Sequence, residues 1–327
     1  AGQLALSFYL GINMAETYLT LTNKVIARLN EVALTSSTFS SARGIQVQCQ
    51  NSVNESIRYI NQKEFQYPFN HATDTEVLVA GTVRYSIPAN AKTLDYNTFR
   101  IVKDSTLSVN GGRLSIVNYN DYLNSFISQE DEILTTTLSQ THTDSVTTIT
   151  VASTTGFDTT GTLYVGNEII TYTAIGSSTT FTGCTRGSSS TTATSYASGV
   201  QVAQFEGGGV PDVVVRTPDN NYLLYPFPTK SYTIKYDYFT FPSDMTAYDD
   251  TTSIPDRFAA VIIDGATAFV YQYRGETQQY QLNMQRFEQG IKNMQTLLIN
   301  RFDYIRSTYI PQSSSASNGS TLNVRVN

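Results

Sequence analysis

Helical sequence patterns lie at both ends of this chain, and strand patterns fill the sequence between them. In the C-terminal part, apolar residues recur every three or four positions over 258–269 and again over 280–298, with a break at Arg274-Gly275 and glutamine-rich faces opposite. Amphipathic helices bury their apolar stripes only by packing against other elements. We therefore expect two packed C-terminal helices, neither of which carries a reactive group.

Two amphipathic helices are also expected near the N-terminus, over 18–32 and 42–62. Thr20 or Thr22 is placed to cap the first of them. The apolar stripe of the second consists of Ile45, Cys49, Val53, Ile57 and Ile60. Because the amphipathic segments at the two chain ends all need partners, we predict that they meet in one bundle.

Strand patterns begin near residue 75, where the alternating segments 75–80 and 82–87 flank Ala80-Gly81 and predict a tight hairpin. A second hairpin is expected around the Asn110-Gly111-Gly112 turn, followed by a short helix over 118–126. Three later segments, which predict further strands of the same sheet, lie at 210–216, 222–228 and 231–241.

Residues 133–206 differ from the rest of the chain, because they are rich in Ser and Thr and carry few charges. Low-complexity disorder is one interpretation of such a stretch. However, apolar and polar residues alternate at 163–165 and 169–172, and glycines separate the short runs. This pattern favours a small all-β module inserted into a loop of the main body.

These patterns predict an α+β fold in which a helical bundle from both chain ends packs with a central antiparallel β-sheet or barrel. The main body is expected to comprise 14–132 and 207–310, and the inserted β-module 133–206. Residues 311–327 are predicted to form an extended C-terminal arm. The arm ends in alternating apolar residues that suit a strand added to the sheet edge of a neighbour, and a frayed tail is the alternative.

The charge balance argues against nucleic-acid binding. The chain has 21 Lys and Arg residues against 27 Asp and Glu residues, which gives a net charge of −6 and a pI of about 5.0. Such a molecule repels a phosphate backbone overall. Charged residues make up only 15% of the chain, so its polar surface depends on Ser, Thr, Asn and Gln, and 22 Tyr and 16 Phe residues suffice for a core.

Few residues are candidates for chemistry. His71 and His142 are the only histidines, and neither has a partner at the spacing that a zinc site needs. A serine nucleophile would be marked by Gly-x-Ser-x-Gly, which the sequence lacks. The glycines at 207–209 are not followed by the Lys-Ser/Thr pair of a phosphate-binding loop.

Two acidic runs remain, Glu130-Asp131-Glu132 and Asp249-Asp250. Calcium binding and an acid/base pair for glycoside hydrolysis are the functional interpretations of such runs. Solvated turns and helix N-termini are the commoner setting for such runs, and the spacing of oxygen ligands supports neither site. We therefore predict no catalytic, cofactor-binding or metal-binding residue, no cofactor, and a protein that is not an enzyme.

The remaining signals concern the cellular setting. Cys49 and Cys184 lie in segments of different type, so no disulfide framework is expected, and assembly in a reducing compartment is favoured. No apolar run reaches the roughly 18 residues of a membrane helix, so no membrane partner is expected. Met14-Ala15 is interpreted as a translation start with 1–13 as upstream sequence, and a signal peptide, which would need a basic n-region, is the alternative.

Three segments outside the Ser/Thr-rich stretch carry a family resemblance. They are NKVIARLNEV followed by ARGIQVQCQNSVNESIRYINQKEFQYPF, then YLLYPFPTKSYTIKYDYFTFPSDM, and then IPDRFAAVIIDGATAFVYQYRGETQQYQLNMQRFEQGIKNMQTLLINRFDYIRST. They resemble podovirus tail tubular protein A, the head-to-tail adaptor or gatekeeper of short-tailed bacteriophages. Within 135–204, TTGFDTTGTLYVGNEIITYTAI and TFTGCTRGSSST are similar to a small β-repeat of many phage structural proteins, which the smallest adaptors lack.

This resemblance implies a structural virion protein that forms a ring, usually of twelve copies, between the portal protein and the tail nozzle protein. Double-stranded DNA would pass through the lumen without specific binding, and an acidic conduit suits that role because it repels DNA. The implied partners are further copies of the chain, the portal and the nozzle, with tail fibres as an additional candidate. The implied location is the neck or tail of the virion, after assembly in the host cytoplasm.

The C-terminal end is expected to contribute the oligomer or portal interface. The interface residues of this hypothesis are Leu322, Val324, Val326, Phe302 and Tyr304.

Two other functions compete with this one. An extracellular β-rich adhesin or carbohydrate-binding module would explain the Thr-, Ser- and Tyr-rich strands, although such modules rarely end in two long helices and this chain has no Trp. A glycan-cleaving enzyme built on the acidic runs is the third hypothesis. The mass of the native assembly discriminates among them, because only the adaptor is expected to form rings.

Overall fold

The computed structural model describes residues 16–64, 66–219 and 221–299. The chain divides into two compact units, which we call the helical unit and the β unit. The helical unit comprises the residues up to Phe69 together with those from Ser243 onward, and the β unit is Asn70–Pro242. The hydrophobic clusters of the described residues follow the same division, so each unit has its own core.

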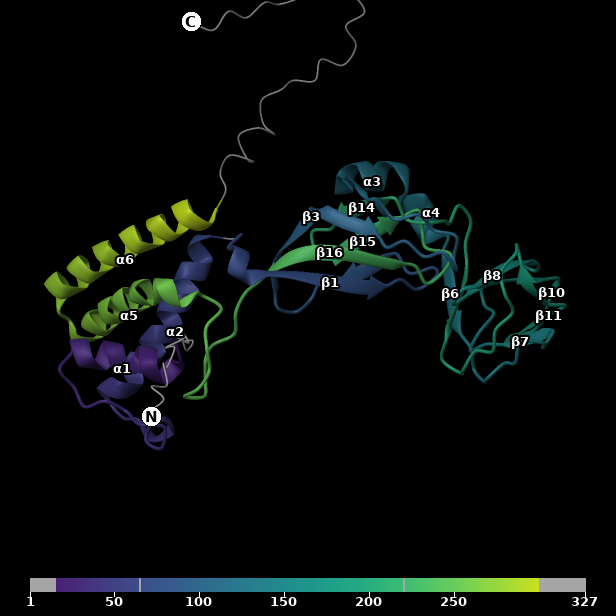
Figure 1. The fold of residues 1–327 in the computed structure, drawn as a ribbon. Coiled ribbons are helices and arrows are strands. Elements are labelled where there is room, and N and C mark those ends of the chain that lie inside the picture. The colour runs from purple at the N-terminus through teal and green to yellow at the C-terminus, as the bar shows by residue number, and fades with distance from the viewer. Residues whose placement is uncertain (1–15, 65, 220, 300–327) are drawn as a thin grey trace, which may run out of the picture. The chain divides into compact units, whose positions relative to one another are not determined.

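Helices from both ends of the chain build the helical unit (Figure 1). Its α-helices are α1 (Tyr18–Arg28), α2 (Ile45–Lys63), α5 (Ala259–Arg274) and α6 (Thr277–Leu298), with short 3-10 turns at Phe39–Ser41, Pro68–Asn70 and Asp256–Phe258. All four α-helices contribute to one hydrophobic core. The prediction that the terminal segments meet in one bundle is therefore confirmed.

The ends of the helices follow local sequence signals, with one correction. Thr17, and not Thr20 or Thr22, caps α1. Its side chain accepts the backbone N–H of Thr20 at 3.2 Å, and the Thr20 hydroxyl in turn accepts the N–H of Thr17. The predicted break between the C-terminal helices is confirmed, because Gly275 adopts a left-handed conformation (φ 76°) that ends α5.

Helix α5 lies at the centre of the helical unit, in contact with α1, α2 and α6. Gly265 allows its closest approach to its neighbours. A Cβ atom at this position would lie 2.4 Å from the Ser56 Oγ on α2 and 2.6 Å from the Phe287 ring on α6. The Ser56 hydroxyl also donates a hydrogen bond to the Ile262 carbonyl at 2.9 Å. A side chain at Gly265 would force these helices apart.

Polar contacts join the N-terminal to the C-terminal part of the helical unit. Ion pairs link Arg28 to Asp264 at 2.5 Å and Arg274 to Glu31 at 2.8 Å, and the Tyr18 N–H donates to the Asp250 carbonyl at 2.8 Å. The ion pairs are partly exposed, so each contributes only about 0–1 kcal/mol. Their effect is to fix how the two parts align, whereas the buried apolar side chains supply most of the stability.

Two four-stranded sheets form one part of the β unit, in which Figure 1 labels β1, β3, β14, β15 and β16. The first has the order β1-β16-β3-β4, with β1 (His71–Val77), β16 (Thr233–Thr240), β3 (Ala91–Ile101) and β4 (Gly112–Arg113). The second has the order β2-β15-β14-β5, with β2 (Arg84–Ser86), β15 (Asn221–Tyr225), β14 (Val213–Arg216) and β5 (Ser115–Val117). An aromatic core includes Phe99, stacked on Tyr236 with ring centroids 4.5 Å apart.

Side chains alternate between two cores along the second sheet. Val214 and Leu224 belong to the aromatic core, whereas Val215 and Leu223 belong to a further cluster that includes residues of α3 (Tyr119–Ser125) and the segment that follows it. This period of two is the geometry of a pleated strand with both faces covered. The short helix predicted over 118–126 is thus confirmed as α3, and α4 (Ile127–Asp131) comes directly after it.

The predicted hairpin across Ala80-Gly81 is wrong. Strand β1 pairs with β16 in the first sheet, whereas β2 pairs with β15 in the second sheet. Gly81 adopts φ 75° at the crossing, where a Cβ atom would lie only 2.4 Å from that of Ala203. The chain therefore passes from the first sheet to the second at Gly81. The alternation of side chains does not determine whether two successive strands share a sheet.

The α+β class is confirmed, with two refinements. The described strands form open sheets, and no closed barrel is found among them. Pairing is mostly antiparallel, but β5 and β14 run parallel.

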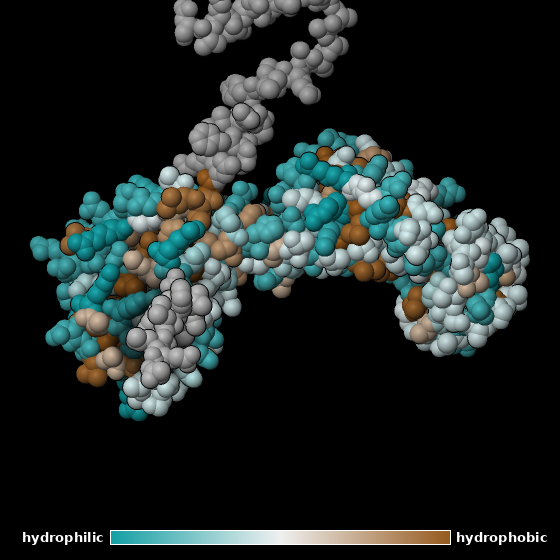
Figure 2. Space-filling model, in the orientation of Figure 1, coloured by the Kyte–Doolittle hydropathy of each residue, from teal (hydrophilic) through white to brown (hydrophobic). Residues whose placement is uncertain are grey.

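The Ser/Thr-rich stretch forms two small sheets, as its alternation indicated. One has the order β12-β9-β8-β13-β6, with β12 (Thr185–Ser188), β9 (Glu168–Tyr172), β8 (Gly161–Val165), β13 (Gln201–Gln204) and β6 (Leu134–Thr137). The other has the order β10-β11-β7, with β10 (Ala174–Ser177), β11 (Thr180–Thr182) and β7 (Thr148–Thr150). Figure 2 shows a pale surface over these strands, neither strongly hydrophilic nor hydrophobic. The assignment of 133–206 as an independent insertion stays a prediction, because these strands belong to the same compact unit as the larger sheets.

A buried ion pair holds the Ser/Thr-rich strands together. Arg186 donates from Nε and Nη2 to the two carboxylate oxygens of Glu168, both at 2.7 Å, and the Glu168 side chain is fully buried. The backbone N–H groups of Gly187 and Thr194 also donate to Glu168, at 2.9 and 3.1 Å. Arg186 donates further to the carbonyls of Thr143 and Thr194, at 2.5 and 2.6 Å. One pair therefore orders several loops of this region at once.

Replacing Gly265 by alanine should destabilise the helical unit. Alanine favours a helix over glycine by about 1 kcal/mol, but its methyl group would collide with Ser56 and Phe287. We expect a net loss of about 1–3 kcal/mol, measured by urea unfolding followed by circular dichroism at 222 nm. Gly112→Ala is the control, because a Cβ atom there meets open space. An equal effect of both changes would contradict the proposed close packing.

Removing one partner of the buried ion pair should have a much larger effect than removing an exposed one. Arg186→Met leaves Glu168 buried and unpaired, which should cost about 3–5 kcal/mol. Arg58→Met breaks a pair with Asp244 in which both side chains are nearly half exposed, and should cost about 0–1 kcal/mol. Hydrogen exchange of the β8 and β9 amides reports the first change. Unaltered protection in Arg186→Met would refute the role given to the pair.

Candidate functional site

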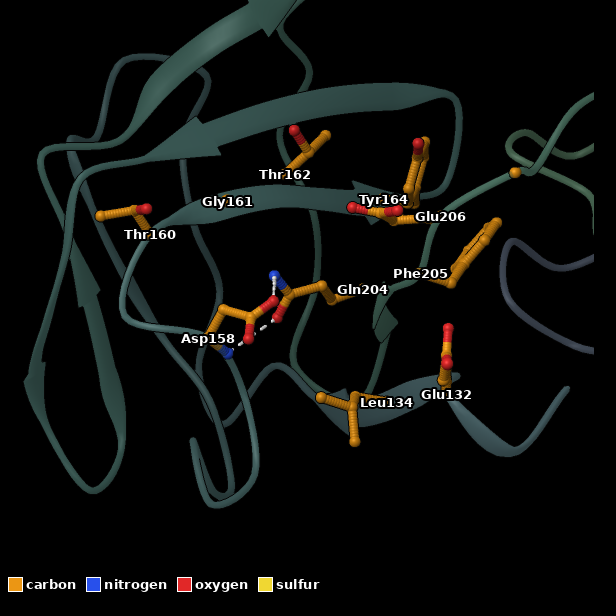
Figure 3. Close-up of a pocket in the computed structure, with 11 residues that line it drawn as sticks. Glu132, Leu134, Asp158, Thr160, Gly161, Thr162, Tyr164, Gln204, Phe205 and Glu206 are labelled. Carbon is orange, nitrogen blue, oxygen red and sulfur yellow. Dashed lines mark hydrogen bonds between the residues drawn. The ribbon is translucent and has the colours of Figure 1, made fainter. Parts of the chain in front are cut away.

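A half-open cleft of about 780 Å³ lies in the β unit, beside β6, β8 and β13 (Figure 3). Eleven residues line it: Glu132, Leu134, Asp158, Thr160, Gly161, Thr162, Tyr164, Gln204, Phe205, Glu206 and Gly207. The sequence analysis named two of them, Glu132 in the first acidic run and Gly207 among the glycines at 207–209, and it named none of the other nine. All eleven come from three separate segments that only the pairing of β8 and β13 with their neighbours brings together.

Gln204 organises one side of the cleft. Its Nε2 donates to the Asp158 Oδ2 at 3.0 Å, and its Oε1 accepts the Asp158 N–H and the Tyr172 hydroxyl, both at 3.2 Å. Figure 3 shows the Asp158 and Gln204 side chains turned toward each other. Because Gln204 is only 8% exposed, these bonds fix the loop that carries Asp158 to the end of β13.

Two aromatic rings form the opposite side of the cleft. Tyr164 stacks on Phe205 with ring centroids 4.5 Å apart. Phe205 is buried, and its ring packs directly against Gly208, where a Cβ atom would lie 2.2 Å from the ring. Burial raises the pKa of the Tyr164 hydroxyl, and Tyr232 and Glu206 add to that increase. The phenol therefore stays neutral at ordinary pH.

The charged groups of the lining are all hydrogen-bond acceptors. Glu132, Asp158 and Glu206 supply three carboxylates, and the lining includes no Lys, Arg, His or Cys. Such a surface accommodates a cationic or hydroxyl-rich group. A nucleophile activated by a neighbouring base needs a pair of side chains within hydrogen-bond reach, and the eleven lining residues form no such pair.

The first acidic run has separate structural roles. Glu130 accepts a hydrogen bond from the Arg84 Nε at 2.9 Å and one from the Tyr122 hydroxyl at 2.7 Å. It thereby ties α3 and α4 to β2. Asp131 is exposed, and Glu132 lines the cleft.

The second acidic run forms a turn. Asp250 accepts the backbone N–H groups of Thr246 and Ala247 at 2.6 and 2.8 Å, and these bonds hold its pKa below the ordinary value. Asp249 is exposed. Within the described ranges no three His, Cys, Asp or Glu residues are grouped as a metal ion would require.

The histidines and cysteines occupy structural positions. The Nε2 atom of His142 accepts the Thr150 N–H at 3.0 Å inside the Ser/Thr-rich region, and His71 lies on the exposed side of β1, 3.6 Å from the Asp237 carboxylate. Cys49 and Cys184 are buried free thiols in different cores. Burial raises the pKa of Cys49 to about 11, which makes it a poor nucleophile.

The glycines at 207–209 lead from β13 toward β14. The Gly209 N–H donates to the Phe227 carbonyl at 2.8 Å, and Gly208 packs tightly against Phe205 and Thr229. These are close backbone contacts, and the segment does not open a helix as a phosphate-binding loop would.

The predicted interface residues lie outside the described residues. This applies to Phe302, Tyr304, Leu322, Val324 and Val326, and to the whole predicted arm at 311–327. Their role stays a prediction. The proposed start at Met14 lies outside as well.

The described residues thus form a helical core from both chain ends and a set of open β-sheets. A family model described as SU10 adaptor protein matches residues 119–309, which is more than half of the chain. The chain belongs to this family of phage adaptor proteins, and it is therefore a component of the virion. No curated protein matches the chain. None of the described helices is long and apolar enough to cross a membrane.

Calcium should not change the stability of this protein, because no three acidic side chains of residues 16–64, 66–219 and 221–299 are grouped to hold a metal ion. We expect the melting temperature to agree within error in 5 mM EDTA and in about 5 mM CaCl2, since a ligand that binds only the folded state would raise it. Differential scanning calorimetry measures this. A rise that disappears in Glu130→Gln or Asp249→Asn would reveal a calcium site at that run.

Proposed function

We propose that this chain is the subunit of a head-to-tail adaptor ring that joins the portal protein to the tail nozzle, as podovirus tail tubular protein A does. The observation that carries this proposal is the family match over 119–309, which extends from α3 through the β unit into α5 and α6. An adaptor of this family has partners among its own copies and among phage head and tail components. Twelve copies is the expected ring size.

The architecture supports a building block more than an enzyme. Both chain ends contribute to one core, and small polar contacts fix their alignment. The cleft in the β unit offers acceptors and aromatic surface without a reactive pair. These features suit a subunit whose work is to present rigid surfaces to its neighbours.

The charge of the chain supports a passive path for DNA. At a net charge of −6, the protein opposes tight binding of a phosphate backbone. A lumen built from such subunits would let double-stranded DNA slide during ejection. In this proposal the DNA is a passing cargo and not a specifically bound ligand.

The C-terminal arm is proposed to connect copies to one another or to the portal. The residues assigned to this contact are Leu322, Val324, Val326, Phe302 and Tyr304. The alternation at 322–326 suits a strand added to a sheet edge. The ring would form in the host cytoplasm and remain in the neck of the particle.

Native mass spectrometry and negative-stain imaging test the ring. We expect rings from the protein alone or on mixing with portal particles of the same phage, and a chain lacking 311–327 should form fewer rings or bind the portal less. A protein that stays monomeric at every concentration and does not bind the portal would overturn the proposed function. Unchanged assembly after the deletion would contradict only the role of the arm.

A further inference from the structure

The outward face of α6 has an unusual composition for this acidic protein. Twelve residues of the helix are exposed: Thr277, Gln278, Gln279, Gln281, Leu282, Gln285, Arg286, Gln289, Lys292, Asn293, Thr296 and Leu297. They include two cations and no acid. Neither Arg286 nor Lys292 forms an ion pair within the part of the chain that the structure describes.

Apolar side chains stand among these polar residues. Leu282 is 45% exposed and Leu297 74% exposed, and they lie near opposite ends of the helix. Figure 2 shows mainly hydrophilic colour along α6, with a hydrophobic area at its C-terminal end. Amides, two cations and separate leucines are a composition that suits a protein contact better than a surface facing only water.

A second surface of the helical unit has the opposite charge. The loop at 243–250 contains Asp244 and Asp249, and Glu55 is exposed on α2. The residue before it, Asn54, exchanges hydrogen bonds with the backbone of Met245 in this loop. The charges of Glu55 and Asp244 both act on Arg58. Arg58 is the cation among these groups, and Asp244 already neutralises it through two hydrogen bonds of 2.7 Å. Asp249 and Glu55 are thus left without an ion pair among the described residues. Tyr248, 44% exposed, adds an aromatic ring to this surface.

The two surfaces lie on different sides of the helical unit. The outward face of α6 points away from α5, which packs between α6 and α1 (Figure 1). The loop at 243–250 is bound to the beginning of α1, where the Leu19 N–H donates to the Tyr248 carbonyl at 3.0 Å. One copy of the chain therefore cannot join its own two surfaces.

We propose that the outward face of α6 in one copy docks on the acidic surface of Glu55, Tyr248 and Asp249 in the next copy. The contact is complementary in charge and joins unlike surfaces, so it is a head-to-tail contact, which closes into a ring when the rotation per subunit allows it. Arg286 and Lys292 meet Glu55 and Asp249, and Leu282 or Leu297 packs against Tyr248. This inference rests on the proposed ring, and it assigns the contact between subunits to the helical unit.

Charge reversal and its compensation test the contact. The double variant Arg286→Glu with Lys292→Glu places four carboxylates in the interface and should raise the apparent dissociation constant of the assembly at least about tenfold, since like charges at an interface cost several kcal/mol. Adding Glu55→Lys and Asp249→Lys to the same chain should restore assembly. Sedimentation velocity and native mass spectrometry, with and without portal particles, measure both steps.

The control variant makes the same change in charge outside α6. Arg43→Glu with Lys103→Glu alters two exposed cations that form no ion pair in the described residues, and this variant should assemble like the parent. Raising the salt concentration from about 50 to 500 mM should weaken the parent assembly, because screening shortens the reach of surface charges.

The outcomes separate this inference from the proposed function. Rings that form equally well from the parent, the reversed variant and the control would overturn the α6 contact while leaving the ring in place. A parent that never assembles would overturn the proposed function, and this inference with it. Loss of DNA retention in a gel-shift assay, with assembly unchanged in the reversed variant, would instead assign the α6 cations to DNA.

Discussion

The helical unit depends on the close packing of α5. Half of the residues of this helix are buried, and Gly265 lets α2 and α6 approach it closely. The core on one side of α5 is supplied by the N-terminal helices, and the core on the other side by α6. Ion pairs at the rim then select one alignment of these helices. Since protein interiors pack as densely as crystals, this arrangement makes the helical unit rigid.

The positions of the helices could be predicted from the sequence, because local patterns of apolar residues and glycine determine them. The break at Gly275 and the stripe of α2 followed from spacing and from the conformational freedom of glycine. The cap of α1 was expected at Thr20 or Thr22, three or five residues too late, because the three threonines are of the same type and only the hydrogen bonds show that Thr17 is the cap. The closure of both ends into one bundle followed from the need of each stripe for a partner.

Strand pairing was predictable only in part. The predicted segment 82–87 contains β2, whereas 75–80 overlaps β1 only at 75–77. Alternation also does not determine which neighbour each strand pairs with. The path through Gly81 is set by the contact with Ala203, more than a hundred residues away in the sequence. The cleft was missed for the same reason, because Asp158 and Gln204 are ordinary residues until β-sheet pairing brings them together. The ion pair of Glu168 and Arg186 likewise joins loops that are separate in the sequence, and no sequence motif predicts it.

The split of the helical core between the two chain ends has a consequence for biosynthesis. The β unit is continuous in sequence and is complete once Pro242 has left the ribosome. Helices α1 and α2 are made before α5 and α6, with which they share a core, so the nascent chain exposes their apolar stripes until α5 and α6 have been made. Contacts of such long sequence separation also form slowly. Termination before α5 would therefore leave a folded β unit attached to an N-terminal segment whose apolar stripes are exposed.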